Sequence, residues 1–375
     1  MIKRLYINNF KCLENFELPI SNQPSSLLIG PNGVGKSSVG EVLSILQKIA
    51  RGCNRVGQFA TPKDFAHNRS NLPMRFEIEV DILGESYKYN LALELPEGFK
   101  EMRVTEEMLS YQGVEVYARN AAQVTMTRTK RPDIQSKRPD ARFLVDWHLV
   151  ALPIIQHDSE ADPVYIFRNW LTRMLILAPL PTYISGDSES DTLSPRKDCS
   201  DFGAWFSGLL AHSPSAYTDI DSFVRRVMPD FEDIKNPHTG KESRSLYVQF
   251  RQGQASLSLE FKNLSDGEKC FFICATVLAS NKAYGPVFCF WDEPGTYLSL
   301  SEVDQFIMEL RRSFHSRGQL VITSHHPEAI RRFSAENTLF LHRQSRLEPT
   351  VVRPLDTLEI DDDLIESLIL GDVVP

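Results

Sequence analysis

The stretch that decides the fold is "LLIGPNGVGKSS", from Leu27 to Ser38. It contains the pattern G-x-x-x-x-G-K-[ST] between Gly30 and Ser37, which is typical of a loop that wraps around phosphate groups. Glycines let the backbone curl so that successive N–H groups point at phosphate oxygens. The N-terminus of a following helix adds partial positive charge. The alternative interpretation is a chance glycine-rich turn.

The residues on either side favour the phosphate loop. Leu27, Leu28 and Ile29 end an apolar run that predicts a buried strand. After the loop, apolar residues recur at helical spacing, and Gly52 follows as a stop signal. The predicted apolar face of this helix comprises Val39, Val42, Leu43, Ile45, Leu46 and Ile49. Strand, loop and helix in this order predict a site for a nucleoside triphosphate.

We expect the whole loop to contact the nucleotide. Lys36 is expected to reach the β- and γ-phosphates, and the hydroxyl of Ser37 to coordinate Mg²⁺. The predicted contact residues are Gly30, Pro31, Asn32, Gly33, Val34, Gly35, Lys36, Ser37 and Ser38.

The composition is that of an ordinary globular protein. The 375 residues suffice for one large or two ordinary domains, and 42% of them are hydrophobic. No apolar run approaches the roughly 20 residues of a membrane span, and the N-terminus has no signal-peptide core. Six scattered cysteines without a C-x-x-C pair predict reduced thiols and a cytoplasmic location. The net charge of −8 argues against a surface that is basic throughout.

Strand patterns dominate the first third of the chain. Two short strands are expected within residues 1–20. "MRFEIEVDI" (74–82) and "YKYNLALEL" (87–95) alternate apolar and polar residues, which predicts an antiparallel pair. "VTEEMLSYQGVEVYAR" (104–119) continues this pattern through a glycine turn. The N-terminal third is therefore expected to be largely β, around one nucleotide-binding helix.

The middle of the chain mixes helical patterns with a hairpin. Helices are predicted in "VYIFRNWLTRMLIL" (164–177), "DFGAWFSGLLAH" (201–212) and "IDSFVRRVMPDF" (220–231). "SLYVQFRQGQASLSLEF" (245–261) predicts a hairpin that turns at Gly253. No heptad repeat is sustained over several turns, so the sequence does not predict a long coiled coil.

Residues 119–143 predict an exposed basic loop. Two aspartates oppose seven basic residues, which are Arg119, Arg128, Lys130, Arg131, Lys137, Arg138 and Arg142. The two interpretations are a solvated surface segment and a contact for the phosphates of DNA or RNA. No aromatic residues are interleaved with the charges, which favours the solvated segment.

Three later segments carry polar residues at the ends of apolar elements. "LSDGE" (264–268) opens an apolar helix that Ser265 and Asp266 are suited to cap. "VFCFWDEP" (287–294) and "QLVITSHHPEAI" (319–330) predict buried strands that end in acids and histidines. The alternatives are an ordinary capped helix and ordinary strand-to-turn exits.

The ends of these strands supply the expected catalytic groups. Asp292 is expected to hold the Mg²⁺ shell, and Glu293 to orient and activate the attacking water. His325, the first histidine past its strand, is expected to hydrogen-bond the γ-phosphate or the water. Three strands would then end in functional groups at one edge of an α/β sheet.

Taken in order, these motifs resemble those of the ABC-type ATPases, in the RecF, OLD and SMC-like branch of AAA-type ATP-binding proteins. "LYINNFKCLENFEL" (5–18) also resembles the start of that branch. The resemblance covers roughly residues 1–95 and 240–350. It implies an α/β fold, an ABC-ATPase head. Such a head has a P-loop NTPase core sheet, an antiparallel β subdomain and a helical lid or insertion, here without a long coiled coil.

The resemblance implies roles for single positions. Residues 30–38 would form the Walker A loop, and Asp292 with Glu293 the Walker B motif. His325 would be the switch histidine, and residues 265–267 the signature motif. The signature residues are Ser265, Asp266 and Gly267, which in this family contact the nucleotide of a second copy.

Two further positions match the family less closely. Gln58 is a candidate Q-loop residue, although it follows Walker A at a short distance. "PGTYLSL" (294–300) stands where the D-loop falls, with Ser299 and Leu300 where relatives often carry His-Pro or Asp.

The resemblance divides the chain into four segments. These are an N-terminal ATPase lobe (1–118), a basic loop with a helical insertion or lid (119–240), a C-terminal ATPase lobe (241–350) and a C-terminal tail (351–375). Asp361 to Asp363 in the tail are interpreted as a solvated acidic segment rather than a metal cluster. The segment after the last motif is too short for a Toprim nuclease domain, so we expect any nuclease or toxin to be a separate protein.

The implied function is ATP hydrolysis with Mg²⁺ by two or more copies of the chain. One Walker A loop and one signature per chain imply a head-to-tail dimer around two ATP molecules. Compact heads of this kind resemble the ATPase subunits of bacterial anti-phage systems, which gate an effector protein. The alternatives are a RecF-like DNA-binding ATPase in DNA repair, and a slowly hydrolysing, ATP-locked scaffold that holds a toxin or nuclease.

Overall fold

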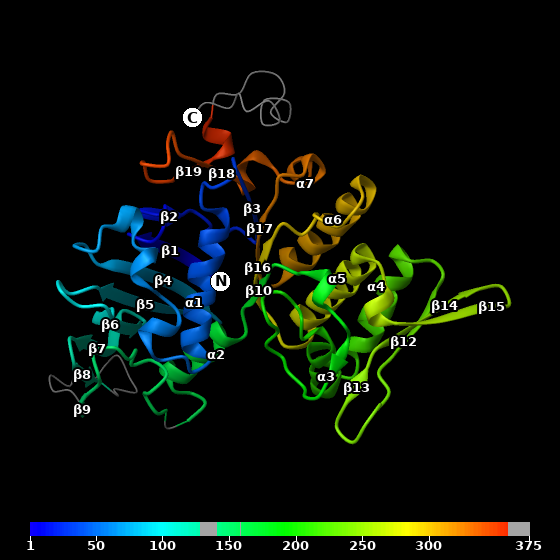
Figure 1. Cartoon of the computed structure of the whole chain (residues 1–375), viewed down its shortest axis with the longest axis horizontal. Helices are drawn as coiled ribbons and strands as arrows, with labels where there is room; N and C mark the ends of the chain where they lie inside the picture. The colour runs from blue at the N-terminus through cyan, green and yellow to red at the C-terminus, as the bar shows by residue number, and fades with distance from the viewer. Residues whose placement is uncertain (128–140, 158, 359–375) are drawn as a thin grey trace. The chain divides into compact units, whose positions relative to one another are not determined.

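The structure is a computed structural model that describes residues 1–127, 141–157 and 159–358 (Figure 1). Unit 1, the first of two compact units, comprises residues 1–23, 29–172 and 339–375, and unit 2 comprises residues 24–28 and 173–338. The predicted domain boundaries after residues 118 and 240 do not coincide with this division. Asp361 to Asp363 and most of the predicted tail lie outside the described residues.

Unit 1 is built on an antiparallel sheet, as predicted for the first third of the chain. In sheet order, its eight strands are β2 (Phe16–Leu18), β1 (Ile2–Asn8), β4 (Met74–Ile82), β5 (Glu85–Glu94), β6 (Arg103–Tyr111), β7 (Val114–Asn120), β8 (Gln123–Met126) and β9 (Ala141–Leu144). β4 and β5 pair from Met74 opposite Leu93 to Ile82 opposite Glu85. The predicted antiparallel pair is therefore confirmed.

Helices cover this sheet in unit 1. α1 (Lys36–Ala50) packs against α2 (Pro163–Thr172), and Phe167 of α2 lies 5.6 Å from the Tyr89 ring of β5. The predicted apolar face of α1 is buried throughout. Short 3₁₀ turns follow at η1 (Val56–Gln58), η2 (Pro62–Asp64) and η3 (Ala66–Asn68), and β18 (Thr338–His342) pairs with β19 (Val351–Pro354) before η7 (Leu355–Thr357).

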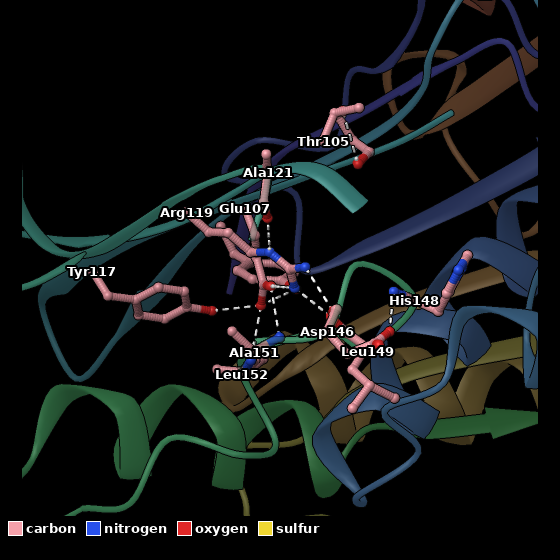
Figure 2. A network of polar contacts seen from close by, with 12 residues as sticks. Thr105, Glu107, Tyr117, Arg119, Ala121, Asp146, His148, Leu149, Ala151 and Leu152 are labelled. Atoms are coloured by element: carbon pink, nitrogen blue, oxygen red, sulfur yellow. Dashed lines mark hydrogen bonds and ion pairs between the residues drawn. The ribbon is translucent and has the colours of Figure 1, made fainter. Parts of the chain in front are cut away.

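A buried polar network ties the segment 146–152 to the sheet of unit 1 (Figure 2). The Glu107 carboxylate accepts hydrogen bonds from the Tyr117 hydroxyl at 2.8 Å and from the backbone N–H groups of Ala151 and Leu152 at 2.7 and 2.8 Å. Burial raises the pKa of Glu107, although these donors and the nearby Arg119 oppose that shift. The network explains why residues past 119 stay within unit 1.

The prediction that residues 119–143 form an exposed basic loop is wrong for Arg119. This residue lies on β7, is 3% exposed, and donates to the carbonyl oxygens of Ala121 at 2.6 Å and Asp146 at 2.9 Å. A third hydrogen bond goes to the Leu149 carbonyl oxygen. Among the described residues of the segment, β8 covers Gln123–Met126, and β9 begins at Ala141. Arg142 is exposed on β9, whereas the other five basic residues lie outside the described part of the chain.

Unit 2 contains a parallel sheet. Its strands are β10 (Leu175–Leu177), β16 (Phe288–Asp292), β17 (Gln319–Thr323) and β3 (Ser25–Ile29), in that order. The helix predicted over 164–177 is wrong at its end, because α2 stops at Thr172 and residues 175–177 form β10. This short strand is stabilised by pairing with β16, from which it is far removed along the chain.

Helices pack around this sheet within unit 2. α5 (Asp266–Ala283) contacts α6 (Leu300–Ser316), and the Phe306 ring of α6 lies 5.2 Å from Trp291 of β16. The remaining helices and turns are α3 (Phe202–His212), α4 (Ala216–Val227), α7 (Pro327–Arg331), η4 (Pro181–Tyr183), η5 (Phe261–Asn263) and η6 (Ala335–Asn337). The longest helix among the described residues is α5, with 18 residues.

Two small sheets complete unit 2. β12 (Phe231–Lys235), β14 (Tyr247–Gln252) and β15 (Ala255–Glu260) form one, and β11 (Asp187–Ser188) with β13 (Arg244–Ser245) forms the other. β14 and β15 form the predicted hairpin, and Gly253 in its turn has a positive φ of 63°.

Two expectations from the composition concern the cysteine thiols and membrane-spanning helices. All six cysteines are free, and four of them are buried. Burial raises the pKa of the Cys270 thiol to about 12, so this thiol stays protonated near neutral pH. Across the ranges the structure describes, we find no helix with the length and apolar character needed to cross a membrane.

Candidate functional site

The predicted phosphate loop has the expected surroundings. All five residues of β3 are buried, and α1 begins at Lys36, at the end of the loop. Pro31, Asn32 and Gly33 are exposed, so the outer arc of the loop is open to solvent. The first turn of α1 contains no acidic residue, which leaves the positive end of the helix dipole uncompensated for an anion.

Two positions of the loop admit only glycine. Gly30 has φ 141°, and a Cβ there would overlap the backbone carbonyl oxygen of Leu341 in β18. Gly35 has φ 96°, and its Cβ would lie 2.6 Å from the Sγ of Cys12. The glycines of the motif are therefore required by packing as well as by backbone conformation.

Residues that the sequence did not indicate hold the loop from behind. The Thr350 hydroxyl donates to the Val34 carbonyl oxygen at 2.8 Å, and the Thr350 N–H donates to the Cys12 carbonyl oxygen at 2.9 Å. Thr350 is buried and lies 316 positions after Val34, so no local pattern could have identified this contact. The brace fixes the backbone whose N–H groups are expected to face phosphate.

The Lys36 side chain folds back onto the start of the loop. Its ammonium group donates to the carbonyl oxygens of Gly30 at 2.7 Å and Pro31 at 3.2 Å, and the residue is only 7% exposed. Ser37, the next residue, is exposed on the first turn of α1. The loop thus combines a cation, backbone donors and a hydroxyl within one turn of chain, which suits a polyphosphate.

In unit 2, the predicted acids gather around a threonine. β16 and β17 run parallel with Asp292 opposite Thr323. The Thr323 hydroxyl donates to Asp292 Oδ1 at 2.6 Å and accepts from the backbone N–H of Glu293 at 2.9 Å. Thr323 was missed in the sequence, although its place as the last residue of an apolar strand beside the acidic one is a usable signal.

Glu293 has an unusual backbone and a histidine neighbour. Its φ of 50° is uncommon for a residue with a side chain, and such conformations gather at functional sites. His325 donates its backbone N–H to Glu293 Oε2 at 3.3 Å, and its Nε2 lies 3.5 Å from Glu293 Oε1. By contrast, His326 caps α7, where its Nδ1 accepts from the N–H of Glu328.

Three parallel strands of unit 2 end together. The backbone N–H of Ser324, the residue after β17, donates to the Leu28 carbonyl oxygen of β3 at 3.2 Å. β16 ends beside β17 at Asp292. The structure therefore brings Asp292, Glu293 and His325 to the carboxyl-terminal edge of the sheet, where α/β proteins bind ligands.

The predicted signature residues begin α5. Ser265 is an exposed N-cap whose Oγ accepts from the Glu268 N–H, while its own N–H donates to Glu268 Oε2 at 2.7 Å. A Cβ on Gly267 would lie 3.1 Å from the Tyr297 carbonyl oxygen, so the signature borders the segment after Glu293. In that segment, Ser299 caps α6 in the same way, with Glu302 as its partner.

The side chain of Gln58 contacts a residue outside the predicted motifs. Gln58 ends η1 in unit 1, is exposed, and its Oε1 accepts from the Cys53 thiol at 3.3 Å. The predicted residues therefore fall into three sets: the loop 30–38, the acid and histidine set, and the signature turn at 265–267.

Comparisons with known proteins bear on the family and the fold of the chain. Residues 1–101 match the family model described as "AAA ATPase domain". An OLD nuclease from Thermus scotoductus is 28% identical over 81 residues, which cover 22% of this chain and 15% of that protein. The chain therefore matches only a small part of the length of this relative.

The fold of the whole chain resembles a solved Smc head, whose structure was determined bound to the C-winged helix domain of ScpA. The two chains are 15% identical with a TM-score of 0.54, over 95% of this chain and 98% of the other. The predicted fold class, an ABC-ATPase head with an antiparallel β subdomain, is thus confirmed. The N-terminal match to an AAA ATPase domain, the stretch shared with an OLD nuclease and the Smc-head fold all make the chain similar to ABC-type ATPases of the RecF, OLD and SMC-like branch.

Proposed function

We propose that the chain binds ATP with Mg²⁺ and hydrolyses it, and that ATP holds two copies of the chain together. The observation that carries the proposal is the set of Asp292, Glu293 and His325 at the ends of adjoining parallel strands, with Thr323 between the two acids. Carboxylates and an imidazole at such an edge are the groups that position a metal and a water for phosphoryl transfer.

Each residue has a part in this scheme. Lys36 binds the β- and γ-phosphates, while the backbone donors of the loop hold their oxygens. Glu293 orients the attacking water and accepts its proton, and His325, which adjoins that carboxylate, contacts the water or the γ-phosphate.

Mg²⁺ fits the residues proposed to hold it. The Ser37 hydroxyl and the Asp292 carboxylate are hard oxygen donors, and Mg²⁺ is usually bound by one or two such groups together with substrate phosphates. When bound, the ion would neutralise charge on the phosphate oxygens. Thr323 holds Asp292 by a 2.6 Å hydrogen bond, which keeps that carboxylate in one orientation.

The pairing of two copies follows from the number of motifs. The chain has one phosphate loop and one signature turn, and Ser265 is exposed at the start of α5. In the proposed dimer, Ser265 and Gly267 of one copy contact the γ-phosphate that Lys36 of the other copy holds. Hydrolysis removes that contact, so the nucleotide acts as a clamp between the two chains.

We further propose that this clamp gates a separate effector protein, a nuclease or toxin, in anti-phage defence. The similarity to an OLD nuclease supports this over a short stretch only.

The main alternative is a RecF-like ATPase that binds DNA. The basic residues that would contact the DNA phosphates, Arg128, Lys130 and Arg131, lie outside the described residues. DNA binding that weakens steeply with added salt, and that substitution of these three residues abolishes, would favour this alternative.

ATP hydrolysis by purified protein tests the proposed site. We expect Lys36→Ala to lose ATP binding and hydrolysis, because the cation at the loop is removed. We expect Glu293→Gln to keep ATP binding but to hydrolyse at least about a hundredfold more slowly, because water activation is lost. Phosphate release and nucleotide affinity are the measurements. If both variants hydrolyse ATP at the wild-type rate, the site is assigned wrongly.

A further inference from the structure

An arginine outside all the predicted motifs lies against the phosphate loop. Arg343 directly follows β18 in unit 1, and its Nη2 is 3.5 Å from the position that a Cβ on Gly33 would occupy. Gly33 is on the exposed outer arc of the loop. The guanidinium group therefore lies beside the open face of Gly33, on the loop that is proposed to bind phosphate.

The same hairpin holds the loop at two other points. Leu341 of β18 packs its carbonyl oxygen against Gly30, and Thr350, just before β19, donates to the Val34 carbonyl oxygen at 2.8 Å. These contacts hold both ends of the β18–β19 connection against the phosphate loop, at Gly30 and at Val34. Arg343 closely follows Leu341, one of these two held ends, in the chain.

The charge of Arg343 is uncommitted. Within the described part of the chain, its guanidinium makes no hydrogen bond or ion pair. The residue is half-buried, and it lines a surface hollow of about 130 Å³ together with Glu348 and Arg353. A guanidinium that is partly removed from water gains most from an anionic partner with paired oxygens, such as a phosphate.

We infer that Arg343 is a further ligand of the polyphosphate chain and reaches it over Gly33. The inference rests on the proposed binding of ATP in the loop. A guanidinium keeps its charge at all accessible pH values and offers two parallel donors, so it complements Lys36, which acts as a point charge. It extends the binding site from one loop to the β18–β19 hairpin.

Arg353 offers a matched control. It lies on β19, lines the same hollow and is exposed. Unlike Arg343, it is not among the nearest neighbours that a Cβ on a glycine of the phosphate loop would meet. A general effect of positive charge on ATP binding would appear in both arginines. A direct contact with phosphate would appear in Arg343 alone.

The test is the affinity of the full chain for ATP and ADP, measured by calorimetry in the presence of Mg²⁺. Arg343→Gln keeps most of the side-chain length and removes the charge, while Arg343→Lys restores the charge without the paired donors. We expect Arg343→Gln to weaken ATP binding by about tenfold to a hundredfold, Arg343→Lys to recover part of the loss, and Arg353→Gln to stay within about twofold of wild type. Thermal unfolding of each variant checks that it is folded.

The comparison of nucleotides locates the contact. A larger loss for ATP than for ADP assigns Arg343 to the γ-phosphate, and an equal loss assigns it to the β-phosphate, and both support the inference. The inference is overturned if Arg343→Gln binds ATP as tightly as wild type, or if Arg353→Gln loses as much affinity as Arg343→Gln. Either result counts against the inference alone when Lys36→Ala still loses ATP binding. Equal ATP binding by wild type and Lys36→Ala would instead reject the proposed function itself.

Discussion

At the scale of single residues, Thr323 organises the acidic end of the site. Its one hydroxyl donates to the Asp292 carboxylate and accepts from the Glu293 N–H, and so it fixes two side chains with different proposed roles. The hydrogen bond to Glu293 also stabilises a backbone with φ 50°, which few residues with a side chain adopt. This part of the site depends on a residue that is not an acid, a base or a metal ligand.

Thr323→Val should therefore impair catalysis more than nucleotide binding. The variant keeps the shape of the side chain but leaves the Glu293 N–H and the Asp292 carboxylate without their partner. We expect the ATPase rate constant to fall by about tenfold or more, because displaced catalytic groups lose rate steeply. Steady-state kinetics with calorimetric ATP binding measures both effects.

Thr276→Val is the control for that substitution. Thr276 is fully buried in α5, and its hydroxyl donates to the Phe272 carbonyl oxygen of its own helix, at 2.8 Å. We expect this variant to hydrolyse ATP at the wild-type rate. Equal rates in Thr323→Val and wild type would contradict the role assigned to Thr323.

A second prediction at this scale concerns Gly30. Gly30→Ala adds a Cβ where the Leu341 carbonyl oxygen already lies, so the loop or β18 has to move. Gly52→Ala is the matched control, because Gly52 also has a positive φ, 107°, but apart from its chain neighbours no atom of the described residues lies within 4 Å of its Cβ position. We expect Gly52→Ala to lose only backbone strain energy, about 1–3 kcal/mol. Gly30→Ala should lose more stability and also ATP affinity.

Urea denaturation and ATP titration measure these differences. Similar stability and similar ATP affinity for the two alanine variants would show that the contact of Gly30 with β18 does not matter to the loop.

At the scale of elements, the strands and helices that bear the site agree with local sequence patterns, and the disagreements arise from distant contacts. The apolar run before Gly30, the helix after it and the strand before Asp292 could all be predicted, because burial periodicity and glycine positions are local. The strand at 175–177 could not be predicted, since it is three residues long and is stabilised by pairing with β16.

Arg119 illustrates the same limit for a charged residue. Its place among other basic residues predicted an exposed segment. Besides the nearby Ala121, however, it contacts Glu107 and the carbonyl oxygens of residues 146 and 149. The partners at 107, 146 and 149 are distant in sequence, so charge patterning alone could not reveal the burial of Arg119. The brace by Thr350 and the position of Arg343 were missed for the same reason.

The buried network predicts a large effect of Glu107 on stability. Glu107→Ala would leave the N–H groups of Ala151 and Leu152 without acceptors and Arg119 without its nearest carboxylate (Figure 2). We expect the free energy of unfolding to fall by about 3 kcal/mol or more. Urea denaturation measures this change.

Glu106→Ala is the control on the same strand. Its carboxylate is 58% exposed and pairs with Arg75 at 3.0 Å, and exposed pairs contribute at most about 1 kcal/mol. Equal losses for the Glu106 and Glu107 variants would contradict the importance of the buried network.

At the scale of the whole molecule, the proposed ATP clamp needs a second copy of the chain. The phosphate loop belongs to unit 1, whereas the acids, His325 and the signature turn belong to unit 2. Each chain supplies one of each motif, and the exposed Ser265 at the start of α5 is the group proposed to meet the ATP of its neighbour. A monomer that never pairs would leave the signature turn without a function.

The most direct test is the molar mass of Glu293→Gln in solution, measured by light scattering during size-exclusion chromatography. This variant should bind ATP without consuming it, so the clamp should stay closed. With ATP and Mg²⁺ we expect a mass twice the 42.7 kDa of one chain, and with no nucleotide, or with Lys36→Ala added to the variant, a smaller share of that dimer. A mass of 42.7 kDa under all these conditions, with ATP bound, would contradict the proposed ATP-held dimer.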